Sequence, residues 1–112
     1  MVAAVGCGAC ALCLWFSLAR AAAAAQDAWR VPPATLLGAF QCLARWESGS
    51  GTTSRNIYGL LDGWAVAGGS GYAADHSPAE QLYRAWRLYQ WSLARYGDGW
   101  LPWPNSRRKC GL

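Results

Sequence analysis

The chain has 112 residues, a formal net charge of +4 and eight tryptophans, and 54% of its residues are hydrophobic. This length allows one domain. The positive charge suits an anionic partner but is too slight to indicate a nucleic acid, so we expect no nucleic-acid partner.

Residues 1–25 have the composition of an export signal rather than of a folded domain. The first 18 residues carry no charge and are almost wholly apolar, and five alanines follow Arg20. This pattern is typical of a cleaved signal peptide, which would leave Gln26 as the first residue of the mature protein. An uncleaved membrane anchor is the alternative, because about 18 apolar residues are marginally long enough to span a bilayer.

Only two of the five cysteines, Cys42 and Cys110, lie outside this segment. An even number of cysteines in an exported protein indicates a disulfide. The bond would enclose most of the mature domain and stabilise it by about 4 kcal/mol in the chain-entropy model. The pattern Cys7-x-x-Cys10-x-x-Cys13 is not interpreted as a metal site, because no fourth ligand follows and it lies in the signal. We expect no metal and no other cofactor.

A first amphipathic helix is predicted over residues 34–47, after an entry segment at residues 26–34. Pro32 and Pro33 prevent a helix from running in from upstream. The apolar residues recur with the spacing of one helix face, and they are Leu36, Leu37, Phe40, Leu43 and Ala44.

Glu47 falls near the centre of the same stripe and is the candidate catalytic residue. A carboxyl on the core side of a helix costs free energy unless it has a partner or a function. Burial beside apolar groups favours the protonated form of a carboxyl, which can then donate its proton to a substrate. The alternative is a carboxylate that points to solvent from the end of the helix.

Residues 48–76 are rich in glycine and are predicted to form loops around one short helix at residues 60–67. A glycine-rich backbone can lie close against a ligand, although a flexible surface loop is the plainer interpretation. A small hairpin here is the most β-structure that the sequence allows. The predicted fold class is therefore mainly α, with a small α+β arrangement as the limit.

A long second helix is predicted after Ser77-Pro78-Ala79-Glu80, which has the pattern of a capping box with proline at the first helical position. Gly97 ends it. Its expected buried stripe consists of Leu82, Trp86, Tyr89, Leu93 and Tyr96. The tail is aromatic and turn-rich, most tryptophans are interpreted as core residues, and His76 is interpreted as structural.

Short motifs follow one another in a fixed order from Cys42 to Cys110. They are Glu-Ser-Gly at residues 47–49, Asn-Ile-Tyr-Gly-Leu at 56–60, Trp64, Gly-Gly at 68–69, Ser-Pro-Ala-Glu-Gln at 77–81 and Trp-Leu-Pro-Trp-Pro at 100–104. This order resembles the transglycosylase-like domain of actinobacterial resuscitation-promoting factors and, more distantly, soluble lytic transglycosylases and goose-type lysozymes. The resemblance covers residues 35–110. It implies a compact lysozyme-like domain over residues 35–112, with a Cys42–Cys110 disulfide.

The resemblance also implies an activity, the cleavage of the MurNAc–GlcNAc bond of peptidoglycan by a lytic transglycosylase or muramidase. Glu47 would be the general acid that protonates the leaving oxygen. Tyr58, Gly59 and Leu60 would line the substrate groove, and Trp64 would pack or stack beside it.

The family pattern continues from Tyr-Gly-Leu to a Gln that helps to hold the sugar, whereas Leu61-Asp62-Gly63 follows here. Asp62 either replaces that Gln as a substrate-binding residue or follows a deletion that removed the Gln. Asp62 could also act as a second catalytic group, or it could be a solvated turn residue or a helix cap. The change favours an alternative function, a peptidoglycan-binding module with weak or no catalysis. A membrane-active cationic protein is disfavoured, because the second helix has the stripe of a core face.

These interpretations predict a monomer that is secreted or associated with the cell wall. Its partner would be peptidoglycan glycan strands. Relatives in the family often act with a cell-wall endopeptidase, which is the second expected partner.

Overall fold

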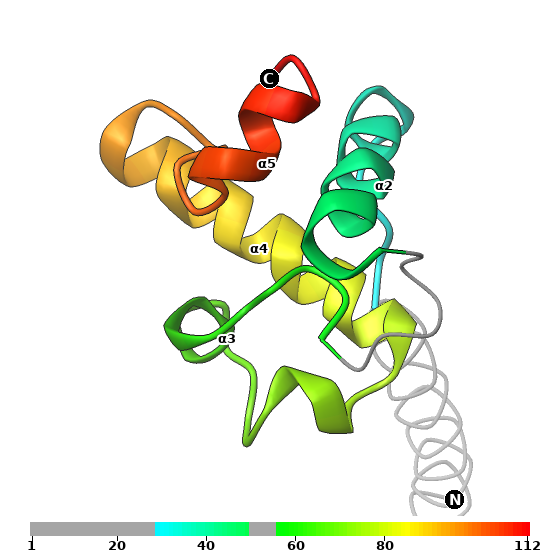
Figure 1. Ribbon diagram of the computed structural model, residues 1–112. Helices are drawn as coiled ribbons and strands as arrows, with labels where there is room; N and C mark the ends of the chain where they lie inside the picture. The colour runs from blue at the N-terminus through cyan, green and yellow to red at the C-terminus, as the bar shows by residue number, and fades with distance from the viewer. Residues whose placement is uncertain (1–28, 50–55) are drawn as a thin grey trace, which may run out of the picture. The chain divides into compact units, whose positions relative to one another are not determined.

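The computed structural model describes residues 29–49 and 56–112, in which helices are joined by loops (Figure 1). In chain order the elements are α2 (Ala34–Ser48), α3 (Asp62–Val66), a single 3-10 turn η1 (Ala73–Asp75), α4 (Pro78–Tyr96) and α5 (Pro104–Lys109). The described residues contain no β-strand, and the mainly α fold class is confirmed for this part of the chain.

The predicted signal segment, residues 1–25, lies outside the described residues, as do residues 26–28 of the entry segment and residues 50–55. Among the helices that are described, none is long and apolar enough to cross a bilayer.

Helix α2 begins and ends almost where the sequence predicts. The carbonyl oxygen of Pro33 accepts hydrogen bonds from the N–H groups of Leu36 and Leu37. Phe40 and Leu43 are completely buried, which confirms the centre of the apolar stripe. The helix stops before Gly49, because that residue has a φ of 87°, which only glycine adopts readily.

Helix α4 has the predicted ends. Ser77 Oγ accepts a hydrogen bond from the Glu80 N–H, Pro78 occupies the first turn, and Gly97 closes the helix in the left-handed conformation. The second half of the capping box is absent, because the Glu80 carboxylate contacts His76 and Arg84 instead of the backbone of Ser77.

The predicted buried stripe of α4 is wrong in phase. Leu93 and Tyr96 are 45% and 58% exposed. The buried positions are instead Glu80, Gln81, Ala85, Leu88 and Ser92, with Leu82, Trp86 and Tyr89 only partly buried at the edge of the core.

The shift follows from the close approach of other segments to α4. A Cβ on Gly63 of α3 would lie 2.6 Å from Cδ2 of Leu88, so α3 rests on α4 through a glycine. Ser92 Oγ donates a hydrogen bond of 2.7 Å to the carbonyl oxygen of Asp98. Small and polar side chains therefore occupy the centre of the buried face.

Phe40 is the centre of an aromatic core that joins distant parts of the chain. Ring centres of Tyr58, Tyr89, Trp100 and Trp103 lie 5.2–6.3 Å from that of Phe40, three of them in edge-on or nearly edge-on arrangements that aromatic pairs favour. The buried Trp103 indole N–H also donates a hydrogen bond of 2.9 Å to the carbonyl oxygen of Tyr58. The C-terminal tail is thereby fixed against the loop that precedes α3.

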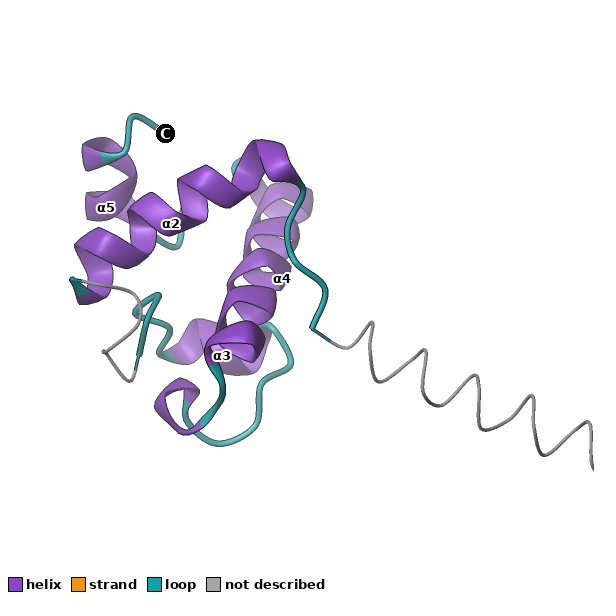
Figure 2. Cartoon of the chain, turned by 90° about the vertical axis from the view of Figure 1, so that its right-hand side faces the viewer, coloured by secondary structure: helices purple, strands orange, loops and turns teal. Residues whose placement is uncertain are grey.

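Helix α5 lies beside α2, as both views show (Figures 1 and 2), and the predicted disulfide joins Cys42 of α2 to Cys110. No helix is predicted here from the sequence, where the tail is described only as aromatic and turn-rich. So short a helix is unstable alone and depends on packing. Arg107 also reaches Asp98, with a 2.6 Å contact between Nη1 and Oδ2, and its hydrogen bond lowers the pKa of Asp98.

Candidate functional site

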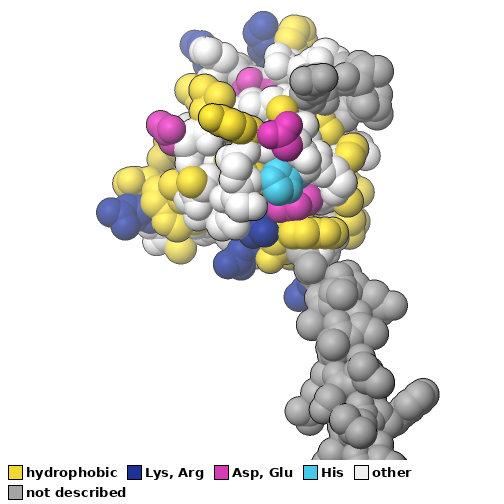
Figure 3. Space-filling model, turned by 90° about the horizontal axis from the view of Figure 1, so that it is seen from below, with side chains coloured by type: hydrophobic (Ala, Val, Ile, Leu, Met, Phe, Trp, Pro, Cys, Tyr) yellow, Lys and Arg dark blue, Asp and Glu magenta, His cyan; other side chains and the backbone are white. Residues whose placement is uncertain are grey.

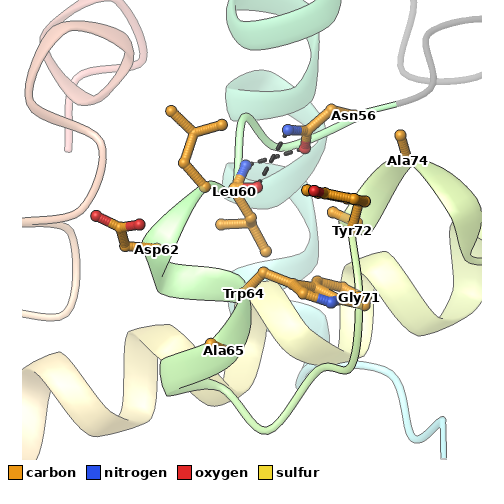
Figure 4. A pocket seen from close by; sticks show the side chains of 10 residues that line it. Asn56, Leu60, Asp62, Trp64, Ala65, Gly71, Tyr72 and Ala74 are labelled. Carbon is orange, nitrogen blue, oxygen red and sulfur yellow. Dashed lines mark hydrogen bonds between the residues drawn. The ribbon is translucent and has the colours of Figure 1, made fainter.

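A cavity of about 550 Å³ opens between the segment 56–65 and the segment 71–74 (Figure 4). Its walls are mostly apolar, and the lining side chains with polar ends are those of Asn56, Asp62 and Tyr72. The apolar walls are formed by Leu60, Leu61, Trp64, Ala65, Tyr72, Ala73 and Ala74.

A second cavity, of about 380 Å³, shares residues 60–62 with the first as a common wall. Its other lining residues come from the loop before α3, from α3 itself, from α4 and from the tail, and they are Gly59, Gly63, Val66, Leu88, Trp91 and Pro102. We call the two cavities together the groove. A mainly apolar hollow with a few polar groups is the usual form of a ligand site.

The loop at residues 56–60 is held in shape by the side chain of Asn56. Its Oδ1 accepts a 2.9 Å hydrogen bond from the Leu60 N–H, and its Nδ2 donates one of 3.1 Å to the Leu60 carbonyl oxygen (Figure 4). Gly59 has a φ of 63°, which lets the backbone turn inside this closed loop. The turn places Gly59, Leu60 and Asp62 along the groove.

Gln81 of α4 fixes the same loop from below. It is 2% exposed, its Oε1 accepts a 2.9 Å hydrogen bond from the Ile57 N–H, and its Nε2 donates one of 3.0 Å to the His76 carbonyl oxygen. The sequence analysis assigned no role to Asn56 or Gln81, although both lie in the quoted motifs. A buried amide that serves two backbone groups has no sequence pattern of its own, and membership of those motifs was the only available signal.

Glu47 is exposed, and the predicted burial of its side chain is wrong. It lies in the last turn of α2, beyond Leu43 and Ala44, which are the last residues of the stripe that reach the core. The carboxyl group nevertheless lies directly against Gly59, because a Cβ on that glycine would be 2.8 Å from Oε2 and 3.2 Å from Cδ. Glu47 therefore lies at the edge of the groove, beside one of the residues that line it.

Tyr58 does not line either cavity, contrary to the prediction. Its side chain is 7% exposed, and its ring meets Phe40 edge-on in the core. Burial raises the pKa of the Tyr58 hydroxyl to about 12. The loop sequence does not indicate that the Tyr58 side chain faces the core, because the positive φ of Gly59 turns the backbone next to it.

Trp64 lines the first cavity from beneath the surface. The indole is 2% exposed and donates a 3.0 Å hydrogen bond from Nε1 to the carbonyl oxygen of Ser70. Gly69 leaves room for this ring, because a Cβ there would overlap it.

His76 is a neighbour of Trp64, with ring centres 4.9 Å apart. Its Nδ1 lies 2.9 Å from Glu80 Oε1 and its Nε2 lies 2.7 Å from the Ser70 carbonyl oxygen. Figure 3 shows the imidazole in cyan on this face, next to acidic side chains. These contacts tie residues 70–76 to the start of α4 and agree with the structural interpretation of His76.

Asp62 is exposed, is the first residue of α3, and lines both cavities. It is thus the one carboxylate in the lining of either cavity, while Glu47 lies at the Gly59 edge. Among the described residues, no three Asp, Glu, His or Cys side chains lie close enough together to hold a metal ion.

Comparison with known proteins adds no assignment. No family model, no curated protein and no solved structure matches the chain.

Proposed function

We propose that this protein cleaves the glycan strands of peptidoglycan as a lysozyme-like lytic transglycosylase or muramidase, with Glu47 as the general acid. The observation that carries the proposal is the placement of the Glu47 carboxyl against Gly59, at the edge of a largely apolar groove. Two of the motifs behind the family resemblance, Glu47-Ser-Gly and Tyr-Gly59-Leu, thus meet in space, although residues 50–57 separate them in the sequence.

The location of Glu47 also argues against a role in stability. A negative charge in the last turn of a helix is opposed by the helix dipole, at a cost of about 0.3–1 kcal/mol. Glu47 forms no ion pair with any of the described residues. Because the Glu47 carboxylate costs free energy at this position, a catalytic role explains its presence better than a stabilising role does.

The chemistry requires one proton transfer at this carboxyl. A sugar seated over Gly59 would cover the Glu47 carboxyl and displace water from it. The proton passes to the glycosidic oxygen as the C–O bond breaks. The muramyl 6-hydroxyl, or a water molecule, then attacks the oxocarbenium-like carbon and returns a proton to Glu47, so the enzyme regains its acid.

A peptidoglycan-binding module with weak or no catalysis is the second candidate. It is favoured by the exposure of Glu47 and by the sequence after Tyr-Gly-Leu, where Leu61-Asp62-Gly63 follows and the family's sugar-holding Gln is missing. For both candidates we propose a location outside the cell membrane, secreted or bound to the wall, and a cell-wall endopeptidase as a co-acting partner.

Purified cell-wall sacculi distinguish the two candidates. We expect the wild-type protein to release soluble muropeptides, with 1,6-anhydro ends visible by mass spectrometry if it is a transglycosylase. Glu47→Gln should lower the release at least a hundredfold, as removal of a general acid does, while sacculus binding and thermal stability are kept or slightly improved.

Asp75→Asn is the matched control, because it removes an exposed carboxylate from η1 that lines neither cavity. It should release muropeptides at the wild-type rate. If the wild type and Glu47→Gln bind sacculi equally and neither releases products, the protein is the binding module and not the enzyme.

A further inference from the structure

One face of α4 carries arginines and a tryptophan in helical register. Arg84, Arg87, Trp91 and Arg95 are spaced by three or four residues, so their side chains emerge on one side of the helix. Arg87 and Arg95 are exposed, Trp91 is 39% exposed, and the Arg95 guanidinium lies 5.6 Å from the centre of the Trp91 ring. We call these four residues the α4 basic face.

The α4 basic face continues the groove. Val66 and Trp91 line the second cavity, and they also line a third hollow of about 250 Å³, whose other walls include Tyr83, Arg84 and Arg87. The groove and this cationic hollow therefore adjoin at Val66 and Trp91, and together they form a path along the surface.

The charges along this path differ from end to end. Asp62 lines the second cavity, whereas no carboxylate lines the third hollow. Arg84 is engaged by Glu80, at 3.3 Å, and by the Ala67 carbonyl oxygen, at 3.1 Å. Arg87 and Arg95 form no ion pair with the other residues that the structure describes.

An occupant of this path must be short, partly apolar and negatively charged at the end remote from Asp62. The peptide arms of a peptidoglycan strand have this chemistry, since they carry small apolar side chains and free carboxylates. Like charges repel and opposite charges attract, so the carboxylates of an arm would avoid Asp62 and lie at Arg87.

We propose that the α4 basic face, together with Val66, binds the carboxylate-bearing peptide arm of a glycan strand seated in the groove, with Arg87 as the carboxylate partner and Trp91 as the apolar contact. This proposal rests on the proposed function, and it adds that the protein prefers peptide-bearing strands to bare ones.

The test compares soluble glycan chains that keep their peptide arms with the same chains after an amidase has removed the arms. Neither preparation contains phosphate polymers. We expect the wild type to bind the peptide-bearing chains more tightly, and added salt to weaken that preference because it screens the charges. Arg87→Gln should weaken binding of peptide-bearing chains about three- to fivefold, the range of an exposed ion pair, and leave binding of bare chains unchanged.

Arg108→Gln of α5 is the matched control, because it removes the same charge from an exposed position outside the α4 basic face. Trp91→Leu tests the apolar contact and should reduce the same preference. Thermal unfolding of each variant confirms that the fold is intact; if Trp91→Leu is unstable, Arg87→Gln, at an exposed position, still decides the outcome.

Three results would overturn the inference while leaving the proposed function in place. The first is equal affinity of the wild type for both preparations. The second is an equal loss of affinity for peptide-bearing chains in Arg87→Gln and Arg108→Gln. The third is a loss of affinity in Arg87→Gln that appears only on intact walls rich in phosphate polymers. If the wild type binds and cleaves neither preparation, the proposed function itself fails.

Discussion

At Gly59 a single added carbon would alter the site in two ways. Its φ of 63° disfavours any other residue, and a Cβ would lie 2.8 Å from Glu47 Oε2. The carboxyl can rest on the loop only because this position has no side chain. The lack of a side chain at Gly59 also lets the Glu-Ser-Gly motif and the Tyr-Gly-Leu motif come into contact.

Gly59→Ala should therefore lower both stability and glycan cleavage. The strained backbone costs about 1–2 kcal/mol, and the new methyl group displaces Glu47, so we expect at least a tenfold loss of muropeptide release. Urea unfolding and the sacculus assay measure the two effects.

Gly97→Ala provides the comparison for Gly59→Ala. Gly97 has a similar φ of 76°, but a Cβ there meets nothing within 4 Å. Gly97→Ala should therefore lose about as much stability as Gly59→Ala but keep full activity. Equal activity in the two variants would show that contact between Glu47 and Gly59 is unimportant.

At the scale of elements, the groove depends on how α4 holds the loop in front of it. The Gln81 side chain links two segments, because its Oε1 accepts a hydrogen bond from the Ile57 N–H and its Nε2 donates one to the His76 carbonyl oxygen. The loop at 56–60 and the turn that leads into α4 are thus fixed to each other through a single buried side chain.

Replacement of Gln81 by Leu keeps the size of the side chain but leaves two backbone groups without these hydrogen bonds. We expect the free energy of unfolding to fall by about 2–4 kcal/mol, since a buried unsatisfied polar group costs about 1–3 kcal/mol. Urea denaturation measures the loss.

Gln90→Leu is the matched control on the same helix. The Gln90 Oε1 atom is buried and has no hydrogen-bond partner among the described residues. Its replacement by Leu should leave stability unchanged or raise it slightly. A similar loss in both variants would mean that Gln81 acts through packing and not through its hydrogen bonds.

Sequence analysis succeeded for those features of the elements that depend on neighbours in the chain. Ser77 and Gly97 bound α4 as expected, because an N-cap hydroxyl and a left-handed glycine act within one turn. It failed for the face that α4 buries and for the exposure of Glu47. Both are decided by what packs against a helix, which periodicity alone does not specify.

At the scale of the whole molecule, the disulfide joins α2 to the end of the chain across 68 residues. The enclosed segment contains the loop of the groove, α3 and α4. Closing a loop of this length reduces the conformational entropy of the unfolded chain far more than that of the folded one. In the chain-entropy model this stabilises the fold by about 4 kcal/mol. That is a large share of the 5–15 kcal/mol typical of a domain.

Cys42→Ser combined with Cys110→Ser should lower the free energy of unfolding by about 4 kcal/mol relative to the oxidised wild type. Chemical denaturation in the presence and absence of a reductant measures it. The reductant should lower the free energy of unfolding of the wild type toward that of the double variant, and it should leave the value for the double variant unchanged. If the wild type unfolds at the same denaturant concentration in both conditions, the bond contributes nothing to stability.

The sequence by itself determined the helical class, the ends of α2 and α4, and the cysteine pair, because caps, proline pairs and cysteine number are local or countable properties. Tertiary structure alone decided that Tyr58 is buried, that Glu47 lies exposed against Gly59, and that residues 104–109 form a helix beside α2. The reason is that burial is a non-local quantity. Phe40, Tyr58 and Trp103 become a core only when segments 18 to 63 residues apart in the sequence come together, as the ring contacts of Phe40 and the hydrogen bond from Trp103 to Tyr58 show.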